Sequence, residues 1–396
     1  MNSKVLVVGL GVVSAIGRGV VEIHRSLQLD NSGIGEARHL RTNLELPVGE
    51  VKLSNDSLKD LLSVKDRIPR TALLGLLAAR DALADSTLDL TGWRTGLISA
   101  TTVGGMDFTE NYFEENLEDL SDGNRDDVRN HECGKITQLI AEDLNVTDFV
   151  TTVNTACSSS ANSIIFGARL IAQGHLDIVV AGGADALCRF TLNGFNSLRI
   201  LDYRQCRPFD ASRAGLNLGE GAAYVVLASD RVVQMDKIKS LCCISGFGNS
   251  SDAFHQTTSS SEGEGSFLAM RESLKRADLE ANQISYINLH GTGTENNDLS
   301  EGMAIKRLFG SNLPMMSSTK GFTGHTLGAS GGLEAVFSIM SIAHGCVYPN
   351  LGFENSIPEL GIIPQLKFGN DLPIRHVMSN SFGFGGNCSS IIFSVK

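Results

Sequence analysis

Short apolar stretches alternate with longer helical segments along most of the chain. The short stretches in the first part are rich in β-branched residues, which is typical of buried strands. They lie over residues 4–8, 95–101, 149–153, 176–181 and 222–227. Small and apolar residues at helical spacing predict helices over 68–84 and 163–172, with a further helix near 19–28. Strands that alternate with helices in this way predict an α/β fold.

The same order of elements starts again after residue 240. Residues 243–248 resemble residues 7–11, since both are apolar strand residues that end in Gly-x-Gly. The later elements are predicted as strands or helices over 267–277, 285–289, 315–318, 333–343 and 389–395. An internal repeat of this kind indicates a duplicated architecture. We therefore expect two α/β halves, 1–240 and 241–396, with sites in the glycine-rich loops at the strand ends.

One cysteine lies in a turn between a predicted strand and a predicted helix. Cys157 follows the strand at 149–153 within Asn-Thr-Ala-Cys-Ser-Ser-Ser, and the helix at 163–172 comes next. Unpaired N–H groups at a helix N-terminus stabilise a thiolate, so we expect the pKa of Cys157 to lie below the free value of about 8.5. This placement indicates a nucleophile, while a buried structural cysteine is an equally open reading of the same residues.

Further glycine-flanked stretches carry groups that could meet this thiol. They are His290 in His-Gly-Thr-Gly-Thr, His325 in Gly-His-Thr-Leu-Gly, and residues 381–386, Ser-Phe-Gly-Phe-Gly-Gly. A thiolate can accept an acyl group, and two imidazoles can stabilise the enolate that forms when a carboxylate leaves as CO2. Backbone N–H groups of the turn and of a glycine loop can hold an oxyanion. This set favours carbon–carbon condensation, whereas a single Cys–His pair would suggest hydrolysis.

Two alternatives for these residues remain open from the sequence. Cys157, His290 and His325 are zinc-ligand types, but they lie on separate turns without paired spacing, and we expect no metal site. Lys320 and Glu334 flank His325 and would form an ion pair if the region were buried, because either charge alone is costly inside a protein. An exposed lysine with an unrelated glutamate is the other reading.

Composition narrows the class of protein. The net charge of -11 argues against a general nucleic-acid binder. The 8 cysteines form no Cys-x-x-Cys pair, which predicts reduced thiols in the cytoplasm. The apolar N-terminal stretch lacks the frame of a signal peptide, and no apolar run is long enough to predict a membrane span. Gly9 and Gly11 match part of a dinucleotide-binding fingerprint, but the third glycine is missing, so the signal is weak.

Taken in order, these motifs resemble the β-ketoacyl-acyl-carrier-protein synthases, the elongating condensing enzymes of fatty-acid and polyketide synthesis. The resemblance covers essentially the whole chain, and its motifs together are specific. They lie at residues 8–14, 154–159, 207–210, 219–222, 290–294, 320–329 and 380–386. The fold that the resemblance implies is thiolase-like α/β, with two duplicated halves in an α-β-α-β-α layered arrangement.

The resemblance also implies roles for single residues. Cys157 is the expected acyl-accepting nucleophile, and His290 and His325 are expected to serve the decarboxylation of malonyl carrier protein. The backbone N–H groups of Cys157 and Phe384 are expected to form the oxyanion hole. The other expected roles are a catalytic lysine and its structural partner, a gate, pantetheine contacts and a border of the acyl pocket. They fall on Lys320 with Glu334, on Phe384 with Phe382, on Thr292 with Thr294, and on Val103.

The implied reaction is a decarboxylating Claisen condensation. An acyl group on Cys157 condenses with malonyl carrier protein to give a 3-oxoacyl carrier protein and CO2. The resemblance implies no cofactor besides the phosphopantetheine arm of the acyl carrier protein. It also implies a homodimer, or a heterodimer with a related synthase subunit, with the strand near residue 153 at the interface. A non-catalytic subunit like a chain-length factor is the alternative, and a thiolase that uses coenzyme A is a third reading.

The chain departs from the family pattern at several positions. Asn387-Cys388 follows the gate where Thr-Asn is usual, Glu295 replaces a proline, and residues 130–134 read Asn-His-Glu-Cys-Gly. These departures concern the substrate more than the chemistry. They favour a specialised synthase, such as one for aryl-polyene or flexirubin-like pigments, over the general fatty-acid enzyme.

Two charged regions bear on the expected carrier protein, which is acidic. The stretch 108–132 is rich in acidic residues and is expected to form an exposed excursion. Basic residues that could dock the carrier gather in two places. They are Lys65, Arg67 and Arg70, and Arg199, Arg204 and Arg207.

Overall fold

The computed structural model describes residues 3–116 and 125–396, and a long mixed sheet runs through it. The strands follow the order β11-β10-β12-β13-β9-β1-β8-β7-β5-β6. The first-half strands are β1 (Val5–Ser14), β5 (Thr95–Ala100), β6 (Phe149–Val153), β7 (Ile178–Asp185) and β8 (Gly221–Ser229). The second-half strands are β9 (Cys242–Ser251), β10 (Tyr286–Asn288), β11 (Met315–Ser317), β12 (His376–Phe382) and β13 (Asn387–Ser394).

The two halves repeat one strand order. β1-β8-β7-β5-β6 in the first half matches β9-β13-β12-β10-β11 in the second, strand by strand. The first strands of the halves, β1 and β9, pair antiparallel through Leu6 with Cys243 and Val7 with Cys242. The predicted duplication is therefore confirmed, while the division at residue 240 stays a prediction.

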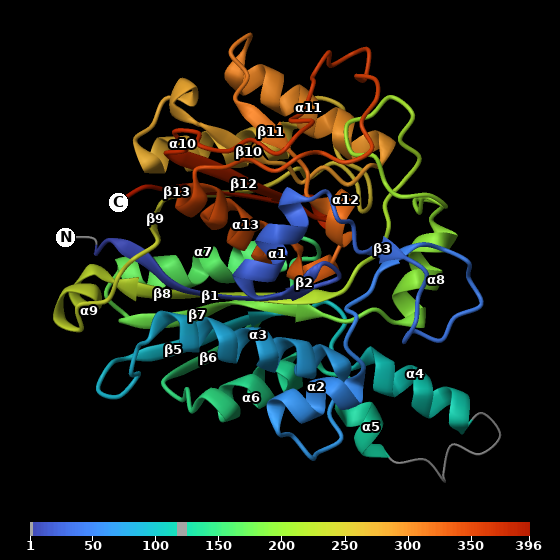
Figure 1. Ribbon diagram of the computed structural model, residues 1–396, viewed down its shortest axis with the longest axis vertical. Coiled ribbons are helices and arrows are strands. Elements are labelled where there is room, and N and C mark those ends of the chain that lie inside the picture. Colours follow the sequence, from blue (N-terminus) through green and yellow to red (C-terminus); the bar gives the residue numbers. More distant parts are fainter. Residues whose placement is uncertain (1–2, 117–124) are drawn as a thin grey trace.

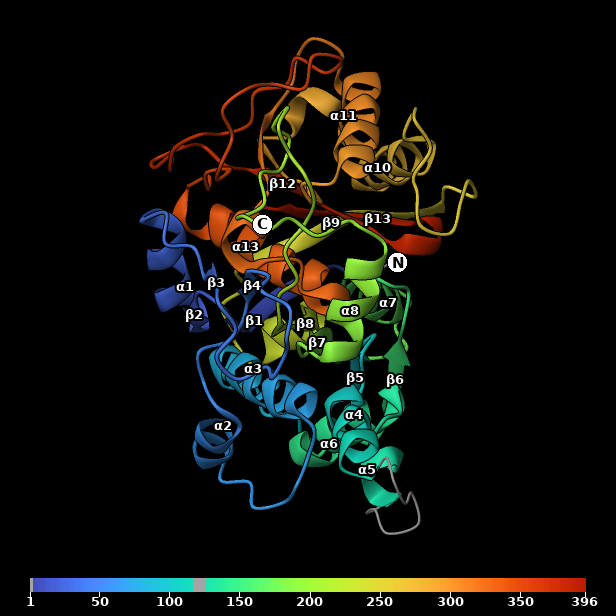
Figure 2. The same ribbon diagram turned by 90° about the vertical axis from the view of Figure 1, so that its right-hand side faces the viewer.

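The strands of each half form one layer, called here the sheet of that half, and helices cover both layers and fill the space between them (Figures 1 and 2). The central layer holds α7 (Ser159–Ala172) and α13 (Ser330–His344), which pack against each other and against strands of both halves. The outer layers hold α3 (Arg70–Ser86) and α6 (Cys133–Leu144) on one side, and α10 (Glu264–Ala277) and α11 (Glu295–Phe309) on the other. The arrangement is the predicted thiolase-like α-β-α-β-α fold.

The remaining helices and short strands surround these layers. They are β2 (Gly17–Arg18), α1 (Gly19–Gln28), β3 (Ile34–Gly35), β4 (Val48–Gly49), α2 (Asn55–Leu62), α4 (Met106–Glu115), α5 (Arg125–Arg129), α8 (Arg189–Ser197), α9 (Asp230–Met235) and α12 (Lys320–Thr323). None of the described helices is both long and apolar enough to cross a bilayer.

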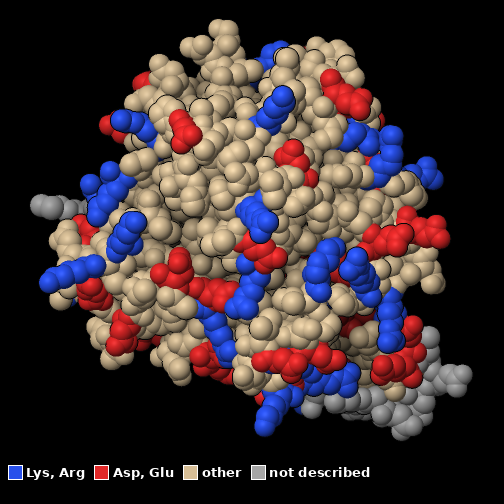
Figure 3. Space-filling model, in the orientation of Figure 1, with Lys and Arg blue, Asp and Glu red and all other residues tan. Residues whose placement is uncertain are grey.

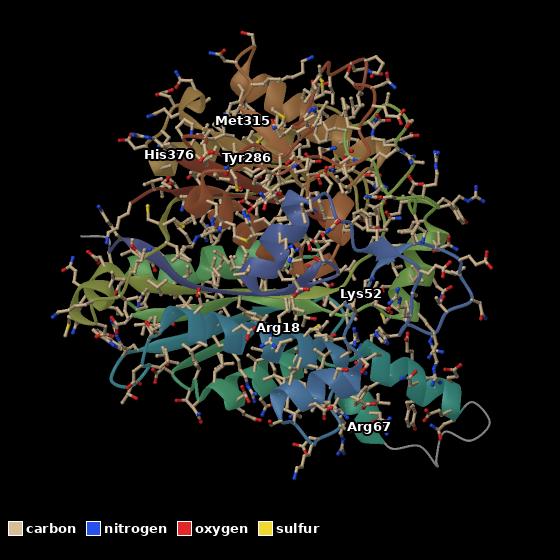
Figure 4. All side chains as sticks on the ribbon, in the orientation of Figure 1. Arg18, Lys52, Arg67, Tyr286, Met315 and His376 are labelled. Carbon is tan, nitrogen blue, oxygen red and sulfur yellow. The ribbon has the colours of Figure 1, made fainter. Side chains whose placement is uncertain are left out.

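Parallel strands bring their loops to one edge of each sheet. In the second half, β10 pairs parallel with β11 and β12, and Figure 4 marks where each of these strands begins, at Tyr286, Met315 and His376. Their carboxyl ends, and the loops that follow, therefore lie at the opposite edge. In the first half, β5 pairs parallel with β6 and β7 in the same way. Loops of both halves can thus meet in one place.

The glycines of β1 have a packing role. A Cβ at Gly9 would lie 2.3 Å from the carbonyl oxygen of Ala82, and one at Gly11 would lie 1.9 Å from that of Ala78. Both carbonyls belong to α3, so the glycines let this helix lie directly on the strand. Close packing of helix on sheet accounts for the Gly-x-Gly pattern, which otherwise suggested a nucleotide.

The described parts of the acidic stretch 108–132 are more ordered than the sequence predicts. α4 covers its first part, with Phe108 and Tyr112 buried one helical turn apart, and α5 lies near its end. Glu114 and Glu115 are exposed, which is why the composition suggested an excursion. Residues 117–124 lie outside the described part of the chain.

Candidate active site

Cys157 occupies a sharp corner between β6 and α7. Ala156 has φ of 53°, a left-handed conformation that turns the chain from the strand into the helix. Ser159, at the start of the helix, closes the corner: its hydroxyl accepts the N–H of Thr155 at 2.8 Å and donates to the carbonyl of Ala156 at 2.5 Å. Cys157 is 7% exposed and lies on the wall of a cavity.

The thiol of Cys157 does not have the lowered pKa that its place before a helix predicts. Burial raises its pKa to about 11. The backbone N–H groups of Phe384 and Cys157 and the charge of Lys320 oppose this rise, but enclosure of the sulfur outweighs them. The prediction is wrong because the helix N-terminus acts on a sulfur that water hardly reaches. Cys157 is therefore a neutral thiol in the resting protein.

Both predicted histidines reach the cavity of Cys157 from the second half. His290 follows β10, and His325 lies in the turn before α13. Their rings stand edge to face, with centroids 5.5 Å apart and planes at 90°. The structure thus brings together three groups that the sequence places on separate loops.

Hydrogen bonds fix which nitrogen of each imidazole carries its proton. Nδ1 of His325 lies 3.0 Å from the backbone N–H of Leu327, which can only donate, so Nδ1 accepts. Nδ1 of His290 lies 3.3 Å from the Nζ of Lys320, and an ammonium likewise can only donate. Each neutral ring therefore carries its proton on Nε2.

Both imidazoles are neutral. Burial, followed by the charge of Lys320, lowers the pKa of His325 to about 3. The same causes and the nearby His325 lower the pKa of His290 well below its usual value. Each neutral ring thus has one Nε2–H that can donate a hydrogen bond to a developing oxyanion.

Lys320 and Glu334 form a buried ion pair. Lys320 is 1% exposed and Glu334 is 2% exposed, which excludes the reading of an exposed lysine. The ammonium of Lys320 also donates to the carbonyl oxygen of His290 at 2.5 Å. Burial raises the pKa of Glu334 and the charge of Lys320 opposes this rise. The pair therefore supplies a fixed cation behind His290.

The end of β12 and the segment after it close the cavity on one side. Phe382 lies edge-on to His290, with ring centroids 5.8 Å apart. Phe384 stacks on Phe195 of α8 at 5.8 Å, with planes at 10°. The N–H of Gly385 donates to the carbonyl of Gln256 at 2.7 Å, so a neighbouring loop supports the segment. Phe384 thus has a backbone N–H beside the sulfur and a ring at the cavity wall.

The cavity has a volume of about 430 Å³ and is lined by both halves of the chain. Thr292 and Thr294 line it, and their hydroxyls are 2.9 Å apart. Val103 does not line it but lies in a separate apolar cluster with Leu46 and Leu327. The predicted border role of Val103 is therefore not part of this cavity.

Two buried carboxylates that the sequence analysis missed shape the His290 loop. Glu301 accepts the N–H groups of His290 at 2.9 Å and Gly291 at 2.8 Å. Asp298 accepts the N–H groups of Gly293 at 3.2 Å and Phe209 at 2.7 Å. Both carboxylates lie on the buried face of α11. Acidic residues on the apolar face of an amphipathic helix were the available signal.

The described residues contain no group of three or more His, Cys, Asp or Glu side chains arranged to hold a metal ion. Cys388, the cysteine nearest the gate segment in sequence, is buried beside Ser266, and burial raises its pKa to about 12. Cys157 is the cysteine that lines the cavity with both histidines.

The first of the two basic groups is only partly available to a partner. Arg70 is 8% exposed and forms an ion pair with Glu220 at 2.6 Å, so its predicted docking role is wrong. The sequence could not show this, because a buried arginine and an exposed one look alike beside a helix start. Lys65 and Arg67 are exposed, although Arg67 pairs with Asp127 at 2.9 Å near the edge of the molecule (Figure 4).

The second basic group lies near the cavity. Arg199 and Arg204 are exposed, and Arg199 lines the cavity. Arg207 is 11% exposed and pairs with Asp202 at 3.0 Å. On the face shown in Figure 3, basic and acidic side chains are interspersed. Of the second basic group, Arg199 and Arg204 are the residues that a partner could reach.

Comparison with known proteins agrees with this site. Residues 2–232 match the beta-ketoacyl synthase N-terminal domain, and residues 241–354 match the C-terminal domain. The 3-oxoacyl-[acyl-carrier-protein] synthase 2 of Staphylococcus aureus strain COL is 32% identical over 412 residues, which cover 99% of this chain and 98% of that protein. The protein of the same name from Vibrio cholerae is also 32% identical, over 98% of each chain.

Solved structures give the same result. The ishigamide ketosynthase/chain length factor is 29% identical with a TM-score of 0.95, and the match covers 100% of both chains. The ketosynthase ApeO in complex with its chain length factor ApeC, from Xenorhabdus doucetiae, is 30% identical with a TM-score of 0.86 over 100% of this chain and 98% of that one. The fold, the ordered motifs and these matches lead to one conclusion: the chain belongs to the β-ketoacyl synthase family.

Proposed function

We propose that this protein is a β-ketoacyl-acyl-carrier-protein synthase, an acyltransferase that catalyses a decarboxylating Claisen condensation. The observation that carries the proposal is the meeting of one thiol and two neutral imidazoles in a single cavity. Cys157 supplies the nucleophile, and His290 and His325 supply two Nε2–H donors. This set suits a reaction that forms an acyl-enzyme and then an enolate.

In the first half-reaction, Cys157 accepts the acyl group. Its sulfur attacks the carbonyl carbon of an acyl thioester on the carrier protein, and the bond to the phosphopantetheine sulfur breaks. The proton of the Cys157 thiol ends on the released phosphopantetheine thiol, so the exchange is balanced. The backbone N–H groups of Cys157 and Phe384, which face the sulfur, hold the oxyanion of the tetrahedral intermediate.

In the second half-reaction, malonyl carrier protein enters and loses CO2. The bond between the carboxylate and the α-carbon breaks, and its electron pair forms an enolate on the thioester. Donation from the Nε2–H groups of His290 and His325 stabilises the enolate oxygen. The α-carbon then attacks the acyl group on Cys157, the thiolate leaves and takes up a proton, and 3-oxoacyl carrier protein is released.

The other residues act around these steps. The buried pair of Lys320 and Glu334 orients His290 and holds its tautomer. Phe384, with Phe382, forms the gate through which the second substrate enters, and Thr292 and Thr294 contact the pantetheine arm. Val103 is proposed to border the acyl chain beyond the described cavity. No cofactor is required besides the phosphopantetheine that the carrier brings.

The proposal includes two partners, an acyl carrier protein and a second synthase subunit. One structural neighbour is a type II polyketide acyl-carrier protein in complex with its ketosynthase, and another is ApeO in complex with its chain length factor. In this chain β6 is the last strand at one end of the sheet and Val150 on it is 41% exposed, which suits a subunit contact. In this proposal, residues 1–240 supply the nucleophile and residues 241–396 supply both histidines. The protein is proposed to act in the cytoplasm.

A specialised acyl chain, as in aryl-polyene or flexirubin-like pathways, remains the proposed substrate class. It is supported by the departures at Glu295 and at Asn387-Cys388, and by the likeness to the ishigamide ketosynthase/chain length factor. Glu295 lines the cavity. The side-chain oxygen of Asn387 accepts the hydroxyl of Ser158, the residue next to Cys157, at 2.8 Å.

The alternative is a non-catalytic subunit like a chain-length factor. Retention of Cys157, both histidines and Lys320 in one site favours the enzyme. The test is mass spectrometry of the purified protein after incubation with acyl carrier protein, with the second substrate withheld. An acyl group on Cys157, absent in Cys157→Ala, supports the synthase and identifies the chain; its absence from the wild-type protein, alone and with a partner subunit, would support the alternative.

A further inference from the structure

Asp185, the last residue of β7, is a buried carboxylate that the mechanism above does not use. It is 0% exposed. One oxygen accepts the hydroxyl of Thr101 at 2.5 Å and the N–H groups of Thr102 at 2.9 Å and Val103 at 3.0 Å. The other accepts the hydroxyl of Thr102 at 2.6 Å and the N–H of Gly328 at 2.7 Å.

The shell around Asp185 suits a carboxylate anion. Every partner given above donates a hydrogen bond, and three of them are backbone N–H groups that cannot accept one. None of the ion pairs found among the described residues includes Asp185. Burial of a carboxylate without a cation is costly unless such donors surround it. Donors from two segments, residues 101–103 and Gly328, therefore converge on one charged group.

One of these donors belongs to the turn that holds His325. Leu327 has φ of 51°, and its N–H donates to Nδ1 of His325 at 3.0 Å. The next N–H, that of Gly328, donates to Asp185. A Cβ at Gly328 would lie 2.8 Å from the carboxylate, so this contact requires glycine. Asp185 thus anchors the turn in which the N–H of Leu327 fixes the tautomer of His325.

The anchor also crosses between the two halves. Asp185 and residues 101–103 belong to the first half, and Gly328 belongs to the second. Gly328 follows the left-handed residue Leu327 and lies two residues before α13. Cys157 has the matching place in the first half: it follows the left-handed residue Ala156 and lies two residues before α7. The corner that carries the nucleophile in one half therefore carries an anchor point in the other.

We propose that Asp185 is a positioning residue for decarboxylation. It holds the 327–328 turn, and through it the Nε2–H donor of His325, in line with the thioester oxygen. This inference rests on the proposed function. Asp185 does not contact Cys157, so it is expected to act on CO2 release and not on acyl transfer to the sulfur.

The test compares three variants of the full-length protein. In Asp185→Asn, the amide nitrogen should take the place of the oxygen that faces Gly328, because the other oxygen accepts two backbone N–H groups. The hydroxyl of Thr102 can rotate to accept from this amide, but the N–H of Gly328 cannot, so the Gly328 contact is lost. Gly328→Ala displaces the same turn while it keeps the charge. Thr102→Val is the matched control, since it removes a donor to the same oxygen and leaves the Gly328 contact intact.

Two activities are measured on each variant, acylation of Cys157 from an acyl carrier protein and CO2 release from malonyl carrier protein. For Asp185→Asn and Gly328→Ala we expect kcat for CO2 release to fall roughly 10- to 100-fold with little change in KM, since small misplacement of a catalytic group has effects of this size. Acylation should change less than about twofold, and Thr102→Val should stay within about threefold of the wild type in both.

A third measurement does not depend on activity. NMR spectroscopy of protein with ¹⁵N-labelled histidine reports the tautomer of His325, assigned by comparison with His325→Gln. The wild type should show a single Nε2–H form, and Asp185→Asn a mixture of tautomers. A wild-type tautomer and wild-type CO2 release in both anchor variants would overturn the inference. If the wild-type protein itself released no CO2, the proposed function would fail, and the tautomer comparison would still decide the role of Asp185.

Discussion

The Nζ of Lys320 lies 3.3 Å from Nδ1 of His290 while the same ammonium pairs with Glu334. One buried cation therefore does two things: it balances a carboxylate, and it keeps the proton of His290 on Nε2. Stability and catalysis are linked at this atom, and they can be separated by substitution.

Lys320→Met should lower both stability and CO2 release. Removal of one partner leaves the carboxylate of Glu334 buried and unpaired, which costs about 3–5 kcal/mol of unfolding free energy. Loss of the donor also frees the tautomer of His290. Urea unfolding and a CO2-release assay measure the two effects. The double variant Lys320→Met/Glu334→Met should regain most of the stability but none of the CO2 release; recovery of both would contradict the role assigned to Lys320.

Alkylation of Cys157 should accelerate with pH well beyond the range of an ordinary thiol. Because burial raises its pKa to about 11, the thiolate fraction grows about tenfold for each pH unit from 7 to 10. The rate of modification by iodoacetamide, followed by mass spectrometry, measures this, with Cys157→Ala to identify other labelled cysteines. A plateau near pH 8.5 would show a thiol of ordinary pKa.

The two buried histidines should each destabilise the folded protein in mild acid. The pKa of His325 is lowered to about 3 and that of His290 is well below its usual value. At these two sites the unfolded chain therefore binds protons below about pH 6.5 that the folded chain does not, so their contribution to stability falls as the pH decreases. Glu301 and Glu334 contribute with the opposite sign, because burial raises their pKa values to about 7. The expected slope is about 1.4 kcal/mol per pH unit for each histidine. Unfolding curves at pH 4.5 to 7.5 measure it, and His325→Gln should remove one histidine's share of the slope.

Charge reversal at Arg199 and Arg204 should weaken use of the carrier protein. Both are exposed and Arg199 lines the cavity, so glutamates there would repel an acidic partner. We expect KM for the carrier to rise about tenfold at low salt, with kcat unchanged, and the difference to shrink as salt screens the charges. Arg276→Glu, an exposed residue of α10 that pairs with Glu272, is the control. Equal KM values in both variants would remove this surface from the proposal.

Much of the fold could be predicted because its signals are local. The apolar strands and the repeated Gly-x-Gly of β1 and β9 depend on neighbours in sequence, and the elbow at Cys157 is read from a few small residues. The sequence could not give the state of the thiol, since the pKa depends on how the second half encloses the sulfur. For the same reason the sequence predicts an exposed Arg70, whereas Arg70 is buried and pairs with Glu220, far along the chain. The sequence likewise could not show that Lys320 pairs with Glu334, because this depends on how deeply α13 is buried.

The seam between the halves has a consequence for how this protein fails. The two sheets join through two residue pairs between β1 and β9, and each half also has an apolar cluster of its own beneath its outer helices. The reacting sulfur and its imidazoles, by contrast, lie on opposite sides of the seam. A slide of about 1 Å along it would leave these two outer clusters intact, disturb the central cluster that both halves share, and misalign sulfur and imidazoles enough to slow the reaction about 100-fold. Catalytic competence is thus a more sensitive gauge of the alignment of the halves than secondary structure, and it should be the first property lost on gentle heating.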